Sequence, residues 1–451
     1  MSSTTIDNPK KTTKTHSMLL NIGPAHPAMH GIVRLITELD GETVVSAEAE
    51  IGYLHRAFEK MCEQGPYNNA IPYTDRLNYV SPIINNVGYC LAVEKLLKLD
   101  TTRRCKYIRV IMSEISRITD HLTCVGASAM ELGAFTVFLY MIKARELLYA
   151  LIEEVTGARL TISYARVGGL KSDLPEGFTD RALAALKETR SILKEVEGLL
   201  NRNRIFVDRM KDTGILSKED ALAYGVTGPF LRSTGIDYDV RKAKDYLVYS
   251  EFDFDVPVGE HGDNLDRYYV RMEEIYQSMR IIEQAIQKNP EGAIMVDGKG
   301  RSIPASVMVD EAKMGQTEHF KNIEVDLDPT LEGSTKRFHE NVYSERKNVA
   351  LPAKEDTYGN IEGLMNHFKL VMYGHGIKPP AGEAYAAVEG ANGELGFYVV
   401  SDGSERPYRV RVRPPCFAIM GVLSKLLVGD MVADIVPTFG SVNMIGGELD
   451  R

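Results

Sequence analysis

The sequence has few cysteines, and none of them forms a C-x-x-C motif. The five positions, Cys62, Cys90, Cys105, Cys124 and Cys416, are an odd number and are scattered along the chain. A disulfide framework is therefore not expected, and this usage fits a reducing compartment. An iron–sulfur cluster held by this chain alone is not expected either, because such clusters need clustered thiolates.

Long apolar runs, a secretory leader and common nucleotide-binding motifs are also missing. Residues 416–440 come nearest to a membrane span, but Lys425, Asp430 and Asp434 interrupt them, so we expect a buried core segment. Residues 1–17 are polar and predict a flexible arm rather than a signal sequence. No H-E-x-x-H, P-loop or G-x-S-x-G motif occurs, and D-G-K-G-R at 297–301 is typical of a turn.

Positive charge is scarcer than negative charge. The chain has 53 Lys and Arg against 62 Asp and Glu, a net charge of −9, which argues against a general nucleic-acid binder. With 451 residues, 44% hydrophobic and 25% charged, the composition excludes disordered, collagen-like and coiled-coil classes. The length suits about three units of roughly 150 residues, or one large interleaved domain.

Residues 18–55 have the pattern of a β region. A short strand begins at Met18, and a hairpin turns at Asp40–Gly41. Residues 23–31 contain two prolines and two glycines, so we expect no regular structure there, only a loop that places His26 and His30 at a strand end. A metal site formed by this H-x-x-x-H spacing is not expected, because the intervening proline prevents the helix it needs. His26 should instead structure the loop.

Residues 56–290 are expected to form a helical core. On a helical wheel over residues 106–152, Arg117, His121 and Glu131 lie on a polar stripe beside an apolar one. The sequence alone favours a solvated helix face. The alternative is a polar seam inside a bundle, which requires paired charges.

The remaining chain divides into two parts. Residues 291–356 are rich in Gly, Lys, Asp and Glu and predict a surface loop or insertion. Residues 357–451 predict an α+β region, with a helix over 363–373 and a hairpin over 394–413 that turns at Asp402–Gly403. The expected fold class is α+β: a central helical bundle with N-terminal and C-terminal antiparallel β hairpins.

A series of motifs resembles the large catalytic-core subunit of respiratory complex I, the D-type or 49-kDa subunit family of NADH–quinone oxidoreductase. They are NIGPAHPAMHGIVRLI (21–36), IGYLHRAFEKM (51–61), PYTDRLNYV (72–80), AVEKLL (92–97), GIDYDVRKA (235–243), GELGFYVVSDGSERPYRVRVRPPC (393–416) and GELDR (447–451). The similarity spans about residues 18–451, except the insertion. This family is related to the nickel–iron hydrogenase large subunit, which implies a hydrogenase-like fold. Hydrogenase chemistry itself is not expected, because its metal needs two C-x-x-C pairs.

The resemblance implies a quinone-reduction chamber, shared with a small subunit that holds a [4Fe–4S] cluster and coupled to proton translocation. Quinone is then the substrate, and this chain alone binds no cofactor or metal. His30 and Tyr79 match the family's quinone-headgroup ligands, and hydrogen bonds from them would strengthen as the quinone oxygens gain charge. Glu131 stands where the family usually has an aspartate that pairs with the histidine. Such a carboxylate would favour the protonated imidazole and reload it after donation.

Other implied roles concern the partner's cluster. Arg76 matches an arginine beside that cluster, where its charge would favour the reduced state, with a surface salt bridge as the alternative. Thr161 stands where many relatives have a titratable histidine, so we hypothesise a cluster potential that depends weakly on pH. The resemblance also makes Arg117 and His121 candidates for a buried polar relay that ends at Glu131.

The implied partners are the cluster-bearing small subunit of the B type, a 30-kDa subunit of the C type, a quinone-site membrane subunit of the H type and a ferredoxin-like subunit of the I type. Neither nucleic acid nor a homo-oligomer is expected, and the implied location is the cytoplasmic side of the bacterial inner membrane. Departures from the family pattern are Asn78 and Asn443 for Asp, Glu50 for His and Ala57 for Gly. A scaffold that only docks other subunits is the rival function.

Overall fold

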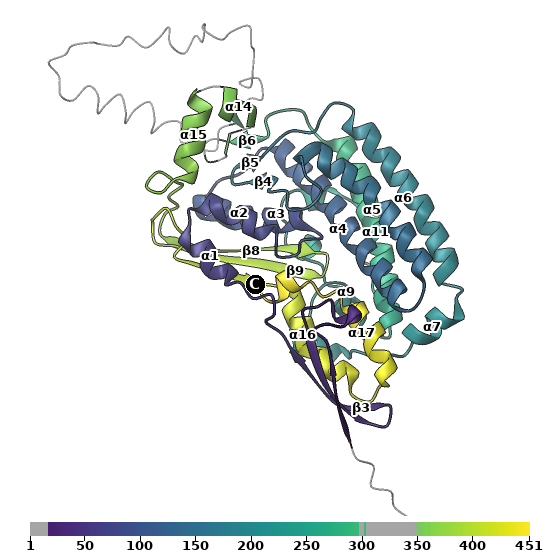
Figure 1. Ribbon diagram of the computed structural model, residues 1–451. Helices are drawn as coiled ribbons and strands as arrows, with labels where there is room; N and C mark the ends of the chain where they lie inside the picture. Colours follow the sequence, from purple (N-terminus) through teal and green to yellow (C-terminus); the bar gives the residue numbers. More distant parts are fainter. Residues whose placement is uncertain (1–16, 297–301, 304–348, 350, 353, 360) are drawn as a thin grey trace, which may run out of the picture.

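The computed structural model describes residues 17–296, 302–303, 349, 351–352, 354–359 and 361–451. Long helices form one side of the molecule, where they run side by side (Figure 1). They are α4 (Arg103–Glu131), α5 (Phe135–Thr156), α6 (Phe178–Leu200) and α11 (Asn264–Lys288). All four helices lie within residues 56–290, the stretch expected to be helical.

Helix α4 lies in the middle of the bundle and packs against both α5 and α11. It begins where the Thr102 side chain accepts a hydrogen bond from the Cys105 amide, an N-cap that satisfies an end-of-helix donor. The single wheel drawn over residues 106–152 was wrong, because the helix breaks before Phe135. Gly133 has a φ of 92° at the break, a left-handed conformation that ends helices and suits glycine.

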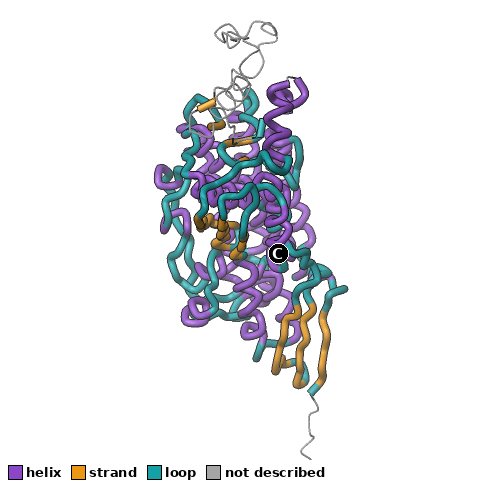
Figure 2. Tube along the Cα trace, turned by 90° about the vertical axis from the view of Figure 1, so that its left-hand side faces the viewer, coloured by secondary structure: helices purple, strands orange, loops and turns teal. Residues whose placement is uncertain are grey.

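The N-terminal sheet has the antiparallel order β1–β2–β3, with β1 (Met18–Ile22), β2 (Arg34–Asp40) and β3 (Thr43–Glu50). The hairpin predicted at Asp40–Gly41 is confirmed by the β2–β3 pairing, and the sheet extends away from the helical body (Figure 2). The loop before β2 differs from the prediction, since η1 (Pro27–Met29) forms one turn of 3-10 helix there. Proline is tolerated at the first position of a helix, where no amide donor is needed.

The C-terminal part holds a second antiparallel sheet of order β10–β9–β8, with β8 (Gly382–Gly390), β9 (Gly393–Ser401) and β10 (Arg409–Arg413). The hairpin predicted around Asp402–Gly403 is confirmed by the pairing of β9 with β10, whereas β8 was not predicted. Helix α3 (Pro82–Leu97) packs on this sheet, and Gly88 brings its backbone close to Phe397. The N-terminal and the C-terminal β regions are thus each a three-stranded sheet rather than a single hairpin.

Residues 416–440 are a core segment, as predicted. They form most of α16 (Pro415–Leu427) and α17 (Ile435–Val442), which share an apolar cluster with the N-terminal sheet. The last helix, α18 (Gly446–Leu449), joins the same cluster. Within the described residues, no helix combines the length and apolar character needed to cross a membrane.

The other elements are mostly short. They are α1 (Phe58–Gln64), η2 (Tyr67–Ala70), α2 (Ile71–Thr74), β4 (Ala165–Arg166), β5 (Gly169–Leu170), α7 (Arg204–Met210), α8 (Lys218–Ala223), α9 (Pro229–Arg232), α10 (Val240–Ala243), η3 (Tyr249–Glu251), β6 (Met295–Val296), β7 (Ser302–Ile303), α14 (Lys354–Gly359), α15 (Ile361–Val371) and η6 (Val432–Asp434). Helix α15 confirms the helix predicted over 363–373. Strands β4–β7 form a small sheet that ties the start of the predicted insertion to the body. Most of that insertion, including D-G-K-G-R, lies outside the described residues.

Candidate functional site

His30 lies at the end of the η1 turn, on the surface and against a buried carboxylate. Its Nε2 is 3.3 Å from Oε1 of Glu131, and the two side chains are 39% and 9% exposed. The imidazole also packs edge-on against Phe439 of α17, with 5.9 Å between ring centroids. His26 caps η1 by accepting a hydrogen bond from the Ala28 amide at Nδ1, which confirms its predicted role in the loop.

Glu131, the last residue of α4, has an unusual environment. Its second oxygen, Oε2, is buried and has no hydrogen-bond partner among the described residues. A Cβ added at Gly440 of α17 would lie 2.5 Å from that oxygen and 3.2 Å from Oγ of Ser128, so the glycine leaves the space that the carboxylate occupies. The pairing of Glu131 with His30 therefore depends on a close approach of α4 and α17.

Tyr79 lies in the turn between α2 and α3, and 42% of its surface is exposed. Partial burial, reinforced by the nearby Asp120 carboxylate, raises the pKa of its phenol above the ordinary value. The phenol therefore stays protonated near neutral pH and can donate a hydrogen bond to a ligand.

The segments that carry His30 and Tyr79 meet at α18. A Cβ on Gly446 would collide with Ile32, two residues after His30, and a Cβ on Gly447 would collide with the backbone carbonyls of residues 76 and 77. Two consecutive glycines thus let both segments pack closely against one short helix. This packing holds the segments of both proposed donors against the same short helix.

Arg76 and Thr161 are both exposed. Nη1 of Arg76 donates to the carbonyl of Pro72 at 2.5 Å, and in the described part of the chain its guanidinium forms no ion pair with a carboxylate. The salt-bridge alternative for Arg76 thus finds no partner among the described residues, and its role near a cluster stays a prediction. Thr161 has a φ of 36°, in the left-handed region, and lies two residues before Ser163, whose backbone and hydroxyl donate to Asp75.

The interpretation of the α4 stripe as a solvated face was wrong. Arg117 and His121 are fully buried, and each has a carboxylate partner. Nε of Arg117 is 3.1 Å from Oε2 of Glu114, and Nε2 of His121 is 2.9 Å from Oε2 of Glu274. Buried charges are tolerated only when they are paired, as they are here.

Arg117 and His121 belong to a larger set of buried charges, which we call the ionic cluster. Its members are Glu114, Arg117, His121, Arg232, Asp239, Arg241, Glu274 and Glu389. Burial lowers the pKa of His121 despite the nearby Glu274, so the imidazole is neutral and Nε2 carries its hydrogen toward the carboxylate. Its Nδ1 is buried without a partner in the described structure. Neither Arg117 nor His121 touches Glu131 through a direct hydrogen bond.

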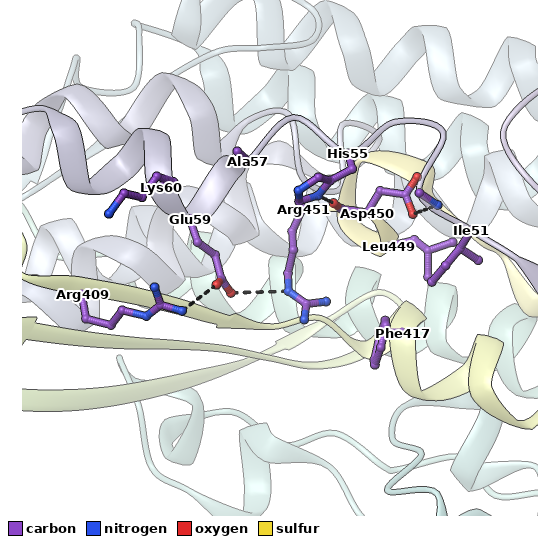
Figure 3. Close-up of a pocket in the computed structure, with 11 residues that line it drawn as sticks. Ile51, His55, Ala57, Glu59, Lys60, Arg409, Phe417, Leu449, Asp450 and Arg451 are labelled. Atoms are coloured by element: carbon purple, nitrogen blue, oxygen red, sulfur yellow. Dashed lines mark hydrogen bonds and ion pairs between the residues drawn. The ribbon is translucent and has the colours of Figure 1, made fainter.

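A pocket of about 370 Å³ lies beside the C-terminus and is lined by neither His30 nor Tyr79. Glu59 lies inside it between two arginines: its Oε2 is 3.5 Å from Nη2 of Arg409, and its Oε1 is 3.4 Å from Nε of Arg451 (Figure 3). The Asp450 carboxylate accepts hydrogen bonds from the amides of Gly52 and Leu54. These charges are already paired within the chain, so we assign the pocket a structural role in anchoring the C-terminus.

Sequence reasoning missed two residues that build the site, Asp120 and Gly440. The wheel places Asp120 at the edge of the polar stripe, but the stripe alone gave no signal that this side chain is buried. The role of Gly440 has no local signal in the sequence, because it depends on the packing of α17 against α4. No group of His, Cys, Asp or Glu arranged to hold a metal ion occurs among the described residues.

Comparison with known proteins identifies the family of this chain. Residues 131–341 and 330–451 match the family model described as "Respiratory-chain NADH dehydrogenase, 49 Kd subunit". The chain is 49% identical over 438 residues to the D-type subunit of NADH-quinone oxidoreductase from Myxococcus xanthus, covering 97% of this chain and 94% of that protein. It is 50% identical over 435 residues to a D-type subunit of the same enzyme from Sorangium cellulosum, covering 96% and 95%.

A third relative is organised differently. The protein from Bdellovibrio bacteriovorus named as a combined C/D subunit of NADH-quinone oxidoreductase is 48% identical over 432 residues, which cover 96% of this chain but 68% of that protein. Identity near one half over almost the whole chain is decisive for family membership. The chain belongs to the 49-kDa, or D-type, subunit family of respiratory-chain NADH dehydrogenase and is a subunit of NADH-quinone oxidoreductase, complex I.

Proposed function

We propose that this subunit forms, together with a cluster-bearing small subunit, the chamber in which complex I binds and reduces quinone. The observation that carries the proposal is the pairing of the surface residue His30 with the mostly buried Glu131, while an exposed, protonated Tyr79 lies on a segment that packs against the same helix, α18. A surface position for both donors suits a chamber whose second wall belongs to another subunit. The chamber is the ligand-binding part of a site that couples quinone reduction to proton translocation.

Reduction of a quinone to a quinol takes two electrons and two protons. The electrons would come from a [4Fe–4S] cluster of the partner subunit. His30 Nε2 and the Tyr79 hydroxyl would each donate a hydrogen bond to one quinone oxygen, and these bonds strengthen as negative charge develops there. The Glu131 carboxylate, 3.3 Å from His30, would favour the protonated imidazole and restore it after donation.

Two further residues act on the partner's cluster in this proposal. Arg76 is exposed and has no ion-pair partner in the described chain, so its positive charge is available to favour the reduced cluster. Thr161 cannot bind a proton near neutral pH. The cluster potential should therefore depend only weakly on pH.

Arg117 and His121 are proposed as parts of a buried polar relay behind the site. Their full burial and their partners in the ionic cluster support a role inside the protein rather than on its surface. The step from His121 to Glu131 has no direct hydrogen bond, and ten residues of α4 separate them by about 15 Å along the axis, so the relay would need a chain of several water molecules. The unpartnered atoms His121 Nδ1 and Glu131 Oε2 are the groups that such water would bind.

The proposed partners follow from the family and from one relative. The relative named as a combined C/D subunit joins a C-type sequence to a D-type sequence in one chain, which supports a C-type neighbour for this chain. We further propose the B-type, H-type and I-type neighbours, attachment to the cytoplasmic face of the bacterial inner membrane, and a hydrogenase-like fold whose former metal pocket became the quinone site.

Replacement of Tyr79 by phenylalanine tests the proposal within the assembled complex. The change removes one hydroxyl and little volume, and a hydrogen bond to a charged group contributes about 1.5–3 kcal/mol, so quinone reduction should fall by roughly tenfold or more. NADH oxidation by a water-soluble acceptor that takes electrons before the quinone site should not change. Tyr269→Phe is the matched control, since Tyr269 is 41% exposed on α11. Wild-type quinone reduction by Tyr79→Phe would support the scaffold alternative.

A further inference from the structure

The carboxylate of Asp120 is buried in the middle of the site and is held by neutral groups only. Its Oδ2 accepts hydrogen bonds from Nδ2 of Asn78 at 2.7 Å and from the Ser81 hydroxyl at 2.8 Å. Its Oδ1 accepts from Nδ2 of Asn443 at 2.8 Å. In the described structure no guanidinium or ammonium group forms an ion pair with it, so these three donors are what satisfies the buried charge.

Two of these bonds clamp the turn that carries Tyr79. Oδ1 of Asn78 accepts from the amides of Val80 and Ser81, so the amide nitrogen of Asn78 must face Asp120. The backbone around Tyr79 is thereby closed into a turn by one side chain, and both ends of the turn are bonded to the same carboxylate. The position of the phenol follows from this closed arrangement.

The third bond reaches the other half of the site. Asn443 follows the end of α17 in a left-handed conformation, and its Nδ2 also donates to Oδ1 of Asn392 at 2.6 Å. Helix α17 carries Phe439, which packs against His30, and Gly440, which makes room for Glu131. Asp120 therefore holds the Tyr79 turn on one side and the helix behind His30 on the other.

We propose that Asp120 is a positioning residue that sets the spacing between Tyr79 and His30. The inference rests on the proposed function, because the spacing matters only if both side chains bind one quinone headgroup. The family pattern has aspartate at the two positions whose side-chain amides donate to Asp120, Asn78 and Asn443. In this chain both are neutral, so Asp120 is the single carboxylate of the three. An aspartate at either position would place two carboxylates less than 3 Å apart, and one of them would have to bind a proton.

Exchange of the charge between positions 78 and 120 tests the inference in the assembled complex. In D120N the new side-chain NH2 group faces the donating amide of Asn78 or Asn443, so at least one of the three hydrogen bonds to residue 120 is lost. The KM for a short-chain quinone should therefore rise by about tenfold. N78D should be at least as harmful, because it adds the second carboxylate. In N78D/D120N, the new carboxylate at 78 can still accept from the amides of Val80 and Ser81, while the new amide at 120 donates to it.

The double variant should therefore recover a KM within about threefold of wild type, which is about 0.7 kcal/mol. D263N is the matched control, because Asp263 is a buried carboxylate that caps α11 rather than the Tyr79 turn, and it should leave this KM unchanged. A KM for N78D/D120N no better than that of N78D would overturn the inference, as would a wild-type KM in D120N. If D120N does not assemble, recovery of assembly and KM in the double variant still supports the inference, and failure of both variants overturns it.

Tyr79→Phe, assayed in parallel, distinguishes a failure of the positioning role of Asp120 from a failure of the proposed quinone site. If that variant lowers quinone reduction while D120N does not, only the positioning role fails. If Tyr79→Phe behaves as wild type, the proposed quinone site itself fails.

Discussion

The ionic cluster holds four carboxylates against three guanidinium groups, and this imbalance predicts which carboxylate carries a proton. Burial, reinforced by the neighbouring Asp239 carboxylate, raises the pKa of Glu389. For Glu274 burial acts in the same direction, but Arg232 and His121 outweigh it and lower the pKa to about 2. We therefore expect Glu389 to be the carboxylate of the cluster that binds a proton most readily, and Glu274 to be ionised.

The two carboxylates should respond very differently to replacement by glutamine. Oε1 of Glu274 accepts from Nε and Nη2 of Arg232 at 2.9 and 2.6 Å, and its Oε2 contacts His121. Glu274→Gln leaves a buried guanidinium without this partner, which costs about 3–5 kcal/mol. Glu389 accepts one bond from Arg232 at 2.9 Å and one from the Val240 amide at 3.0 Å. Glu389→Gln leaves the charge of a protonated carboxyl group unchanged, but its NH2 group must face one of these two donors, so we expect a smaller cost of about 1–3 kcal/mol.

Hydrogen exchange in the assembled complex measures this difference. A multisubunit assembly does not unfold in two states, but protected amides of α4 and α11 report local opening free energies. Because Glu389 keeps a proton that its opened state releases above about pH 4.3, the opening free energy of wild type should fall as pH rises, by up to about 1.4 kcal/mol per pH unit until the raised pKa is passed. Glu389→Gln should remove this slope. An equal loss of protection in both variants, or a slope that persists in Glu389→Gln, would refute the assignment.

Three other substitutions test the potential of the proposed partner's iron–sulfur cluster, the placement of the Glu131 carboxylate and the packing of α3 on the C-terminal sheet. Thr161→His, at a left-handed position that histidine tolerates, should make the partner's cluster potential clearly pH-dependent in potentiometric titrations, whereas the wild-type potential should vary little with pH. Gly440→Ala should push Glu131 away from His30 and lower quinone reduction several-fold while the complex still assembles fully, since its Cβ would lie 2.5 Å from the carboxylate. Gly88→Ala should weaken the packing of α3 on the sheet by about 1–3 kcal/mol, seen as faster exchange of α3 amides, because its Cβ would lie 3.0 Å from Phe397.

Local signals were enough to predict the hairpins but not the full sheets. Asp40–Gly41 and Asp402–Gly403 each stand between residues of β-branched and aromatic character, and such turns are decided within a few residues. Strand β8 has no comparable signal, since its burial does not alternate and it joins β9 through Ala391–Asn392. Its place in the sheet depends on the surface that α3 covers, which a local pattern does not encode.

The polar stripe of α4 shows why burial was harder to predict than periodicity. The wheel correctly grouped Arg117 and His121 on one face but could not show what covers that face. The covering charges come from distant segments, since Glu274 lies 153 residues from His121 and Arg241 lies 127 residues from Glu114. The pairing of His30 with Glu131, across 101 residues, was likewise expected only because of the family resemblance.

Helix α4 is the element that relates these separate contacts to one another. Asp120 and Glu131 are eleven residues apart, which puts them about 16 Å apart along the axis and within about 20° of the same face. One rigid helix thus carries the clamp on the Tyr79 turn and the carboxylate beside His30, and both contacts meet α17 or the residue that follows it. The ionic cluster fixes the rotation of α4 against α11, since a slip of one residue would turn its side chains by about 100° and remove both contacts together. The distance between the two proposed quinone donors is therefore set by the helix bundle, not by the exposed loops on which they lie.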